Sequence, residues 1–154
     1  MAVQLVRVSE KDAEAIWKMQ VDAFAGLLER YRDYDTNPGA ESLERVRAKL
    51  AQERTYFYTI FAEGACVGAI RVIDTHDGQK KRISPIFILP AYRNCGYAQA
   101  AIREAERLHG ENGWALDTIL QEAGNCHLYE KIGYHRTGHL TAVNERMTLV
   151  DYEK

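Results

Sequence analysis

The feature that most constrains this chain is an apolar strand that passes through a proline into a glycine-containing turn and then a helix. Residues 86–89 are all apolar, Pro90 ends the run, and an apolar stripe at helical spacing follows Gly96. The stripe consists of Ala98, Ala101, Ile102, Ala105 and Leu108. We therefore expect a buried strand whose end leads directly into a helix.

The turn between this strand and this helix, Arg93-x-x-Gly96-x-Ala98, predicts an anion-binding site. The first N–H groups of a helix have no acceptor within the helix and carry partial positive charge, so they bind phosphate. Gly96 lets a ligand approach the backbone closely, and Arg93 adds a fixed positive charge. The turn is a candidate pyrophosphate site; the alternative is an ordinary strand-to-helix connection.

The rest of the chain predicts a single α+β domain over residues 1–154, with about seven strands and about four helices. Strands are expected at residues 3–8, 56–62, 66–74, 83–89, 114–120, 134–140 and 145–150. Helices are expected between Ser9 and Arg32, and at about 41–52, 97–109 and 125–132. Pro85 has no backbone donor, so its strand should be bulged or locally unpaired there.

A second segment, residues 125–134, carries two further candidate groups. Asn125 can cap the short helix or bond an amide ligand. Tyr129 lies one helical turn later, on roughly the same face, and its phenol can donate a proton to a thiolate.

Together the two segments resemble the GNAT N-acetyltransferases. The coenzyme A signature of that family, Gln/Arg-x-x-Gly-x-Gly/Ala, reads here Arg93-Asn94-Cys95-Gly96-Tyr97-Ala98, after the apolar lead-in Ile86-x-Ile88-x-Pro90. The family's later motif reads Asn125, then Leu128-Tyr129-Glu130-Lys131-Ile132-Gly133-Tyr134. The likeness is strong over residues 63–140. It departs from the usual pattern at Cys95, where many members carry a charged residue or glycine.

The resemblance implies a mixed, mostly antiparallel sheet, splayed near its centre between strands 86–89 and 114–120. It implies that the pantetheine arm of acetyl-coenzyme A lies in the splay and bonds the backbone near Ile86 and Ile88. The pyrophosphate would sit on the turn, at Arg93, Asn94, Cys95, Gly96, Tyr97 and Ala98. Asn125 would hold the pantetheine arm.

The resemblance also implies the chemistry, which is direct attack of a neutral primary amine on the thioester. A backbone N–H of residues 86–88 would stabilise the oxyanion, and Tyr129 would protonate the departing thiolate. A general base is needed because a protonated amine is not a nucleophile. Asp117, Gln121 and Glu122 remain open for that role, and Glu122 is taken as the candidate.

The acceptor would be a small-molecule or peptide amine, bound mainly by the first two helices and their connection. Tyr31, Tyr34 and Asp35 lie there, together with Asn37 and Glu41. Phenols and carboxylates suit a cationic amine through hydrogen bonds, charge and cation–π contact. The alternative interpretation is a solvated polar loop. The sequence does not identify the acceptor, and it permits a homodimer without indicating an interface.

Composition and charge argue against other classes. The formal net charge of −2 gives no sign of a nucleic-acid partner, and no apolar run approaches the roughly 18–20 residues that span a bilayer. The N-terminus lacks a signal-peptide pattern, so a cytoplasmic location is expected. Three cysteines, an odd number without a CxxC pair, argue against a disulfide framework and a structural zinc site, so no metal is expected.

Two other functions stay open. One is a coenzyme A-binding sensor or structural subunit without transferase activity. The other is a nucleotide-binding domain that uses the turn at residues 93–98. The absence of a Gly-Lys-Ser/Thr ending argues against a P-loop, and Arg93 stands where a dinucleotide fingerprint needs glycine.

Overall fold

The computed structural model describes residues 2–154 and contains a seven-stranded sheet in the order β1-β2-β3-β4-β5-β7-β6. The strands are β1 (Gln4–Arg7), β2 (Thr55–Ala62), β3 (Ala65–Ile73), β4 (Lys81–Ile88), β5 (Trp114–Ile119), β6 (His135–Ala142) and β7 (Thr148–Glu153). The helices are α1 (Ala13–Tyr31), α2 (Leu43–Ala51), α3 (Tyr97–His109) and α4 (Ala123–Lys131). All strand pairs are antiparallel except β4 with β5, which is parallel.

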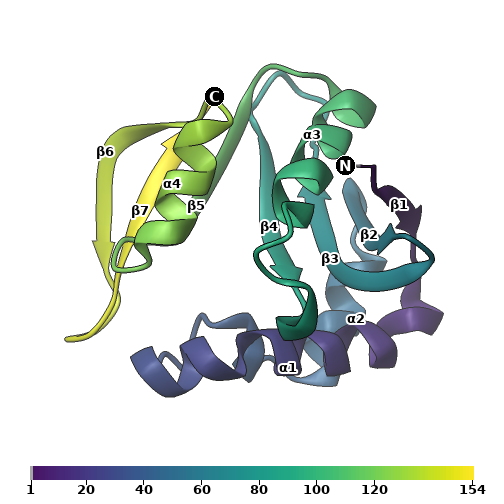
Figure 1. The fold of residues 1–154 in the computed structure, drawn as a ribbon, viewed down its shortest axis with the longest axis horizontal. Helices are drawn as coiled ribbons and strands as arrows, with labels where there is room; N and C mark the ends of the chain where they lie inside the picture. The colour runs from purple at the N-terminus through teal and green to yellow at the C-terminus, as the bar shows by residue number, and fades with distance from the viewer. Residues whose placement is uncertain (1) are drawn as a thin grey trace.

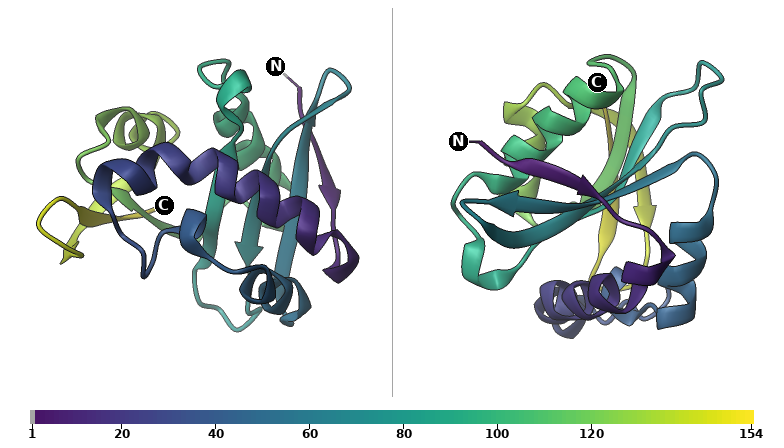
Figure 2. Two further views of the ribbon diagram at one scale, coloured as in Figure 1. Left: turned by 90° about the horizontal axis from the view of Figure 1, so that it is seen from below. Right: turned by 90° about the vertical axis from the view of Figure 1, so that its right-hand side faces the viewer.

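The helices cover the sheet on two sides, with α3 and α4 on one face and α1 and α2 on the other (Figure 2). The largest core cluster lies on the side of α3, because the apolar stripe predicted for that helix packs there with Ala101, Ile102 and Ala105 fully buried. A second cluster joins α1 and α2 to the opposite face through Ile16, Val46 and Phe87.

The sheet opens at its centre, between β4 and β5. These strands pair only at Lys81↔Trp114 and Arg82↔Ala115, and then diverge, as Figure 1 shows. The β3–β4 register shifts between Ile70 and Val72, which is the irregularity expected at Pro85. The prediction of a mixed, mostly antiparallel α+β sheet of seven strands, splayed at its centre and flanked by four helices, is confirmed.

Several predicted boundaries differ from those of the structure by two or three residues, including the starts of the last strand, of α4 and of β4. The last strand was expected at residues 145–150 but begins at Thr148, because the side chain of Asn144 accepts the Arg146 N–H and forms a turn. Helix α4 begins at Ala123, so Asn125 lies inside the first turn and does not cap the helix. Strand β4 begins at Lys81, since its Lys81–Arg82 end pairs with β5.

Within residues 2–154, every helix is too short or too polar to cross a membrane.

Candidate active site

A cleft of about 430 Å³ lies where β4 and β5 diverge. Four parts of the chain line it: one face of α1, the end of β4, the turn that leads into α3 with the first residues of that helix, and α4 with the residue before it. The lining residues are Ala23, Phe24, Leu27, Ile86, Phe87, Ile88, Tyr92, Arg93, Asn94, Gly96, Tyr97, Ala98, Gln99, Glu122, Gly124, Asn125, Leu128 and Tyr129. Both predicted motifs therefore border one cavity.

The edge of β4 that faces the cleft is free of strand pairing. After Arg82, β4 has no partner on the β5 side, while on the other side its pairing with β3 continues to Gly68↔Ile88. The Leu89 N–H donates to Val67 O at 2.8 Å. Because successive residues of a strand turn their backbone groups to opposite sides, the N–H and C=O groups of Ile88 and Ile86 face the cleft.

The N-terminus of α3 opens onto the same cleft. Gly96 is its N-cap residue, with φ 82° and ψ 8°, and no side chain among residues 2–154 caps the helix. Glycine is needed for this left-handed backbone, and a Cβ there would meet no atom within 4 Å. The N–H groups of the first helical turn are thus left for a ligand, in open space that suits a phosphate.

The Arg93 side chain makes two hydrogen bonds that the motif alone does not predict. Its Nε donates to Ile88 O at 3.1 Å, and its second guanidinium nitrogen donates to Ala23 O on α1. Arg93 therefore ties the end of β4 to α1 at the edge of the cleft, and still brings a positive charge to it. Cys95 is exposed and, alone among the six residues of the turn, does not line the cavity.

Helix α4 contributes Asn125 and Tyr129, which both line the cleft. Tyr129 is only 8% exposed and packs edge-on against Tyr134, with ring centroids 6.1 Å apart. Burial, with smaller effects from Asp117 and Cys126, raises the pKa of Tyr129 to about 12. The phenol is thus held in its protonated form, and it is a weaker acid than a free tyrosine.

Glu122 precedes α4 and is held by the end of α1. Its Oε2 accepts hydrogen bonds from the Tyr31 hydroxyl and, at 2.7 Å, from Arg30. Its other oxygen, Oε1, makes no hydrogen bond to any residue in the described range 2–154. Glu122 also lines the cleft, so one carboxylate oxygen is anchored and the other is available.

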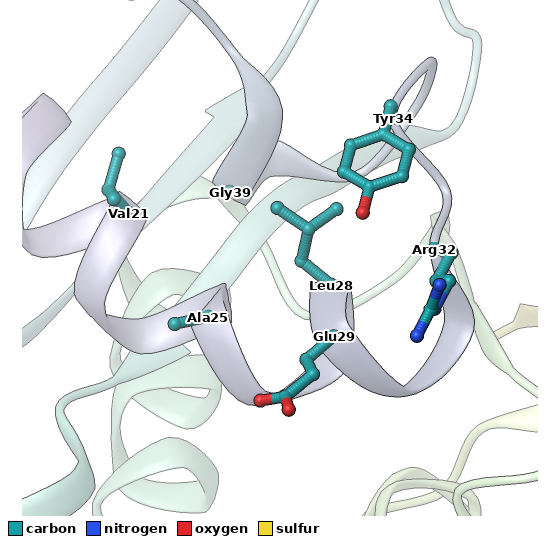
Figure 3. Close-up of a pocket in the computed structure, with 7 residues that line it drawn as sticks. All are labelled: Val21, Ala25, Leu28, Glu29, Arg32, Tyr34 and Gly39. Carbon is teal, nitrogen blue, oxygen red and sulfur yellow. The ribbon is translucent and has the colours of Figure 1, made fainter.

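The predicted acceptor residues separate into two places. Tyr31 is buried and reaches Glu122, although it does not line the cleft. Tyr34 is 65% exposed and lines a different hollow of about 400 Å³, on another face of α1, with Ala25 and Leu28 (Figure 3). Asp35 is exposed on the same loop, and its N–H bonds the side chain of Asp33.

Glu41 and Asn37 have structural partners in this connection. Glu41 accepts from Gln20 at 2.7 Å and pairs with Lys49 at 2.5 Å. Asn37 is buried and accepts the Gly39 N–H at 2.7 Å. Both residues therefore fix the loop between α1 and α2.

Sequence reasoning expected the first two helices to bind the acceptor, but it did not identify the α1 residues that line the cleft. Ala23, Phe24 and Leu27 line it, although their helical spacing indicates only a core face.

Comparisons with known proteins agree with this geometry. The model of the acetyltransferase (GNAT) family matches residues 15–134. No curated protein matches the chain significantly.

Solved structures of acetyltransferases share the fold. A spermidine N-acetyltransferase from Vibrio cholerae, in complex with CoA and spermine, has a TM-score of 0.75 and 17% identity, covering 97% of this chain and 93% of that one. An acetyltransferase from Thermus thermophilus has a TM-score of 0.72 and 14% identity, covering 99% and 96%. The ribosomal-protein-S18-alanine N-acetyltransferase from Escherichia coli has a TM-score of 0.72 and 13% identity, covering 97% and 91%.

Proposed function

This chain belongs to the acetyltransferase (GNAT) family, and on that premise we propose that it transfers an acetyl group from acetyl-coenzyme A to a primary amine. The observation that carries the proposal is the composition of the cleft. An unpaired strand edge, an uncapped helix N-terminus and a buried phenol all border one cavity. Each matches a different part of a thioester of coenzyme A.

Three elements would bind the cosubstrate. The N–H groups at the start of α3, with the charge of Arg93 nearby, suit the pyrophosphate. The backbone of Ile86 and Ile88 suits the two amides of pantetheine, which would add to the sheet as a further strand. Asn125 can hold the pantetheine arm from the other wall of the cleft.

The reaction would need two protons removed from the acceptor nitrogen and one supplied to the sulfur. Glu122, through its available Oε1, would take a proton from the ammonium group of the acceptor. The neutral amine would attack the thioester carbonyl carbon, whose oxygen would accept a hydrogen bond from a backbone N–H of the Ile86–Ile88 edge. The carbon–sulfur bond would break, and Tyr129 would give its proton to the departing sulfur. The attacking nitrogen would lose its second proton through water to the Tyr129 phenolate, which restores the phenol and leaves a neutral amide.

We place the acceptor at the end of α1, where Glu122, Arg30 and Tyr31 converge. Tyr34 and Asp35 would touch only an acceptor long enough to extend past α1 to the hollow of Figure 3. The related structures are named for a polyamine acceptor and for a protein alanine, so either class is compatible with this fold. Asp35→Asn and Tyr34→Phe should then raise KM for long acceptors and leave KM for short amines unchanged.

A screen that follows thiol release from acetyl-coenzyme A, with polyamines, amino acids and peptides as acceptors, tests the proposal. We expect release that depends on one class of amine, and calorimetry should detect coenzyme A binding. Binding without amine-dependent release would favour a coenzyme A sensor. A thermal shift with ATP or NAD but not with coenzyme A would favour a nucleotide-binding domain.

A further inference from the structure

Arg71 is a buried positive charge in the middle of the sheet, outside the cleft. It lies on β3 and is 6% exposed, on the face that α1 and α2 cover. One guanidinium nitrogen donates to Ser84 O at 2.9 Å, and the other donates to Gln52 Oε1 at 2.9 Å. Its Nε is buried without a hydrogen-bond partner among residues 2–154. No carboxylate forms a salt bridge with it in this range; burial lowers its pKa, and the charge of Glu41 opposes that effect.

The residue stands opposite the irregular part of β4. Ile70 pairs with Ile86 and Val72 pairs with Ile83, so the single residue Arg71 faces the two residues Ser84 and Pro85. Pro85 cannot donate to the ladder, and the extra residue disrupts the pairing, so backbone groups at the bulge lack strand partners. The guanidinium takes the place of one such partner, since it binds the carbonyl of Ser84.

The bulge also lies next to the point where the sheet opens. The last β4–β5 pair is Arg82↔Ala115, and the cleft-facing residues Ile86 and Ile88 follow the bulge directly. A bulge changes the local twist of a strand, so its geometry decides how the strand beyond it is oriented. Through Gln52, the C-cap residue of α2, Arg71 links this bulge to the helical layer.

Stability alone gives a poor reason for an arginine at this position. An apolar residue of similar length would avoid the cost of burying a charge and an unpartnered Nε, and such replacements of buried charges are often neutral or stabilising. A guanidinium is instead suited to hold two acceptors in a fixed plane, because its donors form a rigid fork.

We propose that Arg71 is a positioning residue that fixes the β4 bulge against the end of α2 and thereby orients the Ile86–Ile88 edge that receives coenzyme A. This inference rests on the proposed function, since it assumes that pantetheine binds that edge. Arg71 lies outside the cavity, so it would affect the ligand indirectly, through the orientation of β4.

The test compares the full chain with Arg71→Met and Arg71→Lys, with coenzyme A affinity measured by calorimetry and stability by thermal unfolding. Arg71→Met keeps an unbranched side chain as far as the position of Nε and removes both donors, so the Kd should rise at least about tenfold. Lysine can bind Ser84 O but cannot bridge to Gln52 in the same plane, so its Kd should lie between those of the other two proteins. Faster hydrogen exchange of the Phe87–Leu89 amides should accompany the loss.

Gln20→Leu is the matched control. Gln20 is a buried polar residue of α1 that bonds Pro38 O and Glu41 in the connection between α1 and α2. The Gln20→Leu variant should have a lower Tm, and its Kd for coenzyme A should stay within about twofold of the wild-type value. Unchanged Kd in folded Arg71→Met, or an equal rise in Gln20→Leu, would overturn the proposal. If Arg71→Met does not fold, an unchanged Kd in Arg71→Lys overturns it equally. Absence of binding by the wild-type protein would instead refute the proposed function.

Discussion

At the scale of single residues, the acidity of Tyr129 decides how much its proton can contribute to the rate of acetyl transfer. A pKa of about 12 puts it about two units above a free tyrosine, so full proton transfer is harder by about 3 kcal/mol. Tyr129→Phe removes the hydroxyl and keeps the packed ring. We expect kcat to fall about 10²-fold, the lower end of the range for one acid–base group, with little change in the acetyl-coenzyme A KM.

Initial rates of thiol release at saturating acceptor measure this effect. Tyr134→Phe is the control, because it removes a neighbouring buried hydroxyl that bonds Glu106 and does not line the cleft. It should keep kcat within about threefold of wild type. A Tyr129→Phe rate in that same range, with chemistry rate-limiting, would mean that the thiolate leaves without this proton.

Glu122 is the second residue whose role rests on its immediate contacts. Glu122→Gln keeps the shape but cannot accept a proton, so kcat/KM for the acceptor should fall at least about 10²-fold. Glu29→Gln, which changes an exposed carboxylate in the hollow of Figure 3, should have no effect on a short amine. Steady-state kinetics with the acceptor varied would test both. Equal activity of the two variants would contradict the role of Glu122 and would leave Asp117 or water as the candidate general base.

Motif spacing singled out Gly96, Asn125 and Tyr129, and the structure brings all three to one cleft, while their roles stay predictions. Spacing could not predict that Arg93 binds the carbonyl of Ala23, 70 residues away, or that Tyr31 binds Glu122, 91 residues away. Those contacts arise only when α1 packs across the open end of the sheet.

At the scale of elements, the start of α3 is the feature most open to a direct test. Gly96→Glu would place an anion where the pyrophosphate should lie, and the left-handed φ would add strain of about 1–2 kcal/mol. We expect the Kd for coenzyme A to rise at least about tenfold, or about 1.4 kcal/mol. Gly78→Glu introduces the same charge at a φ of 84°, also with open space around it, in the loop before β4. Gly78→Glu should therefore lower the stability of the protein and leave the Kd for coenzyme A unchanged. Similar Kd values for both variants would contradict the assignment of the pyrophosphate site to the start of α3.

The elements themselves were predictable where an apolar pattern defines them. The stripe of α3 and the run that becomes β4 indicated both elements, and Pro85 indicated the bulge. The start of β7 was not predictable from that pattern, because a side-chain turn at Asn144 competes with strand pairing. Strand β6 is exposed along its whole length, so only its pairing with β7 defines it.

At the scale of the whole molecule, His109 joins the end of α3 to the part of the sheet where β4 and β5 still pair. This residue ends α3, and its Nε2 lies 2.8 Å from the Tyr58 hydroxyl of β2. Its ring packs on Trp114 of β5, with centroids 6.5 Å apart, and its Nδ1 lies 3.9 Å from the carboxylate of Asp74. Neither its spacing nor its neighbours in sequence indicate this position, which depends on three strands meeting one helix end.

Protonation of His109 should therefore affect the stability of the whole fold. Burial lowers its pKa; Asp74 opposes this effect, while Lys81, Arg7 and His76 add to it. Below the unfolded pKa of about 6.5, the unfolded chain binds this proton more readily than the folded protein does. The free energy of unfolding contributed by this group is thus fully present above that pH and is lost as the pH falls through it.

We expect the free energy of unfolding to decrease as the pH falls from about 7.5 to about 5.5. In His109→Gln, the free energy of unfolding should depend less steeply on pH over this range. Glutamine can still bond Tyr58 but does not titrate, and carboxylates contribute alike to both proteins. Urea unfolding at several pH values measures both slopes, whose difference has an upper limit of about 1.4 kcal/mol per pH unit for one proton. Equal slopes would show that the imidazole binds protons equally well in both states, and would leave His109 as a packing residue that joins α3 to the sheet.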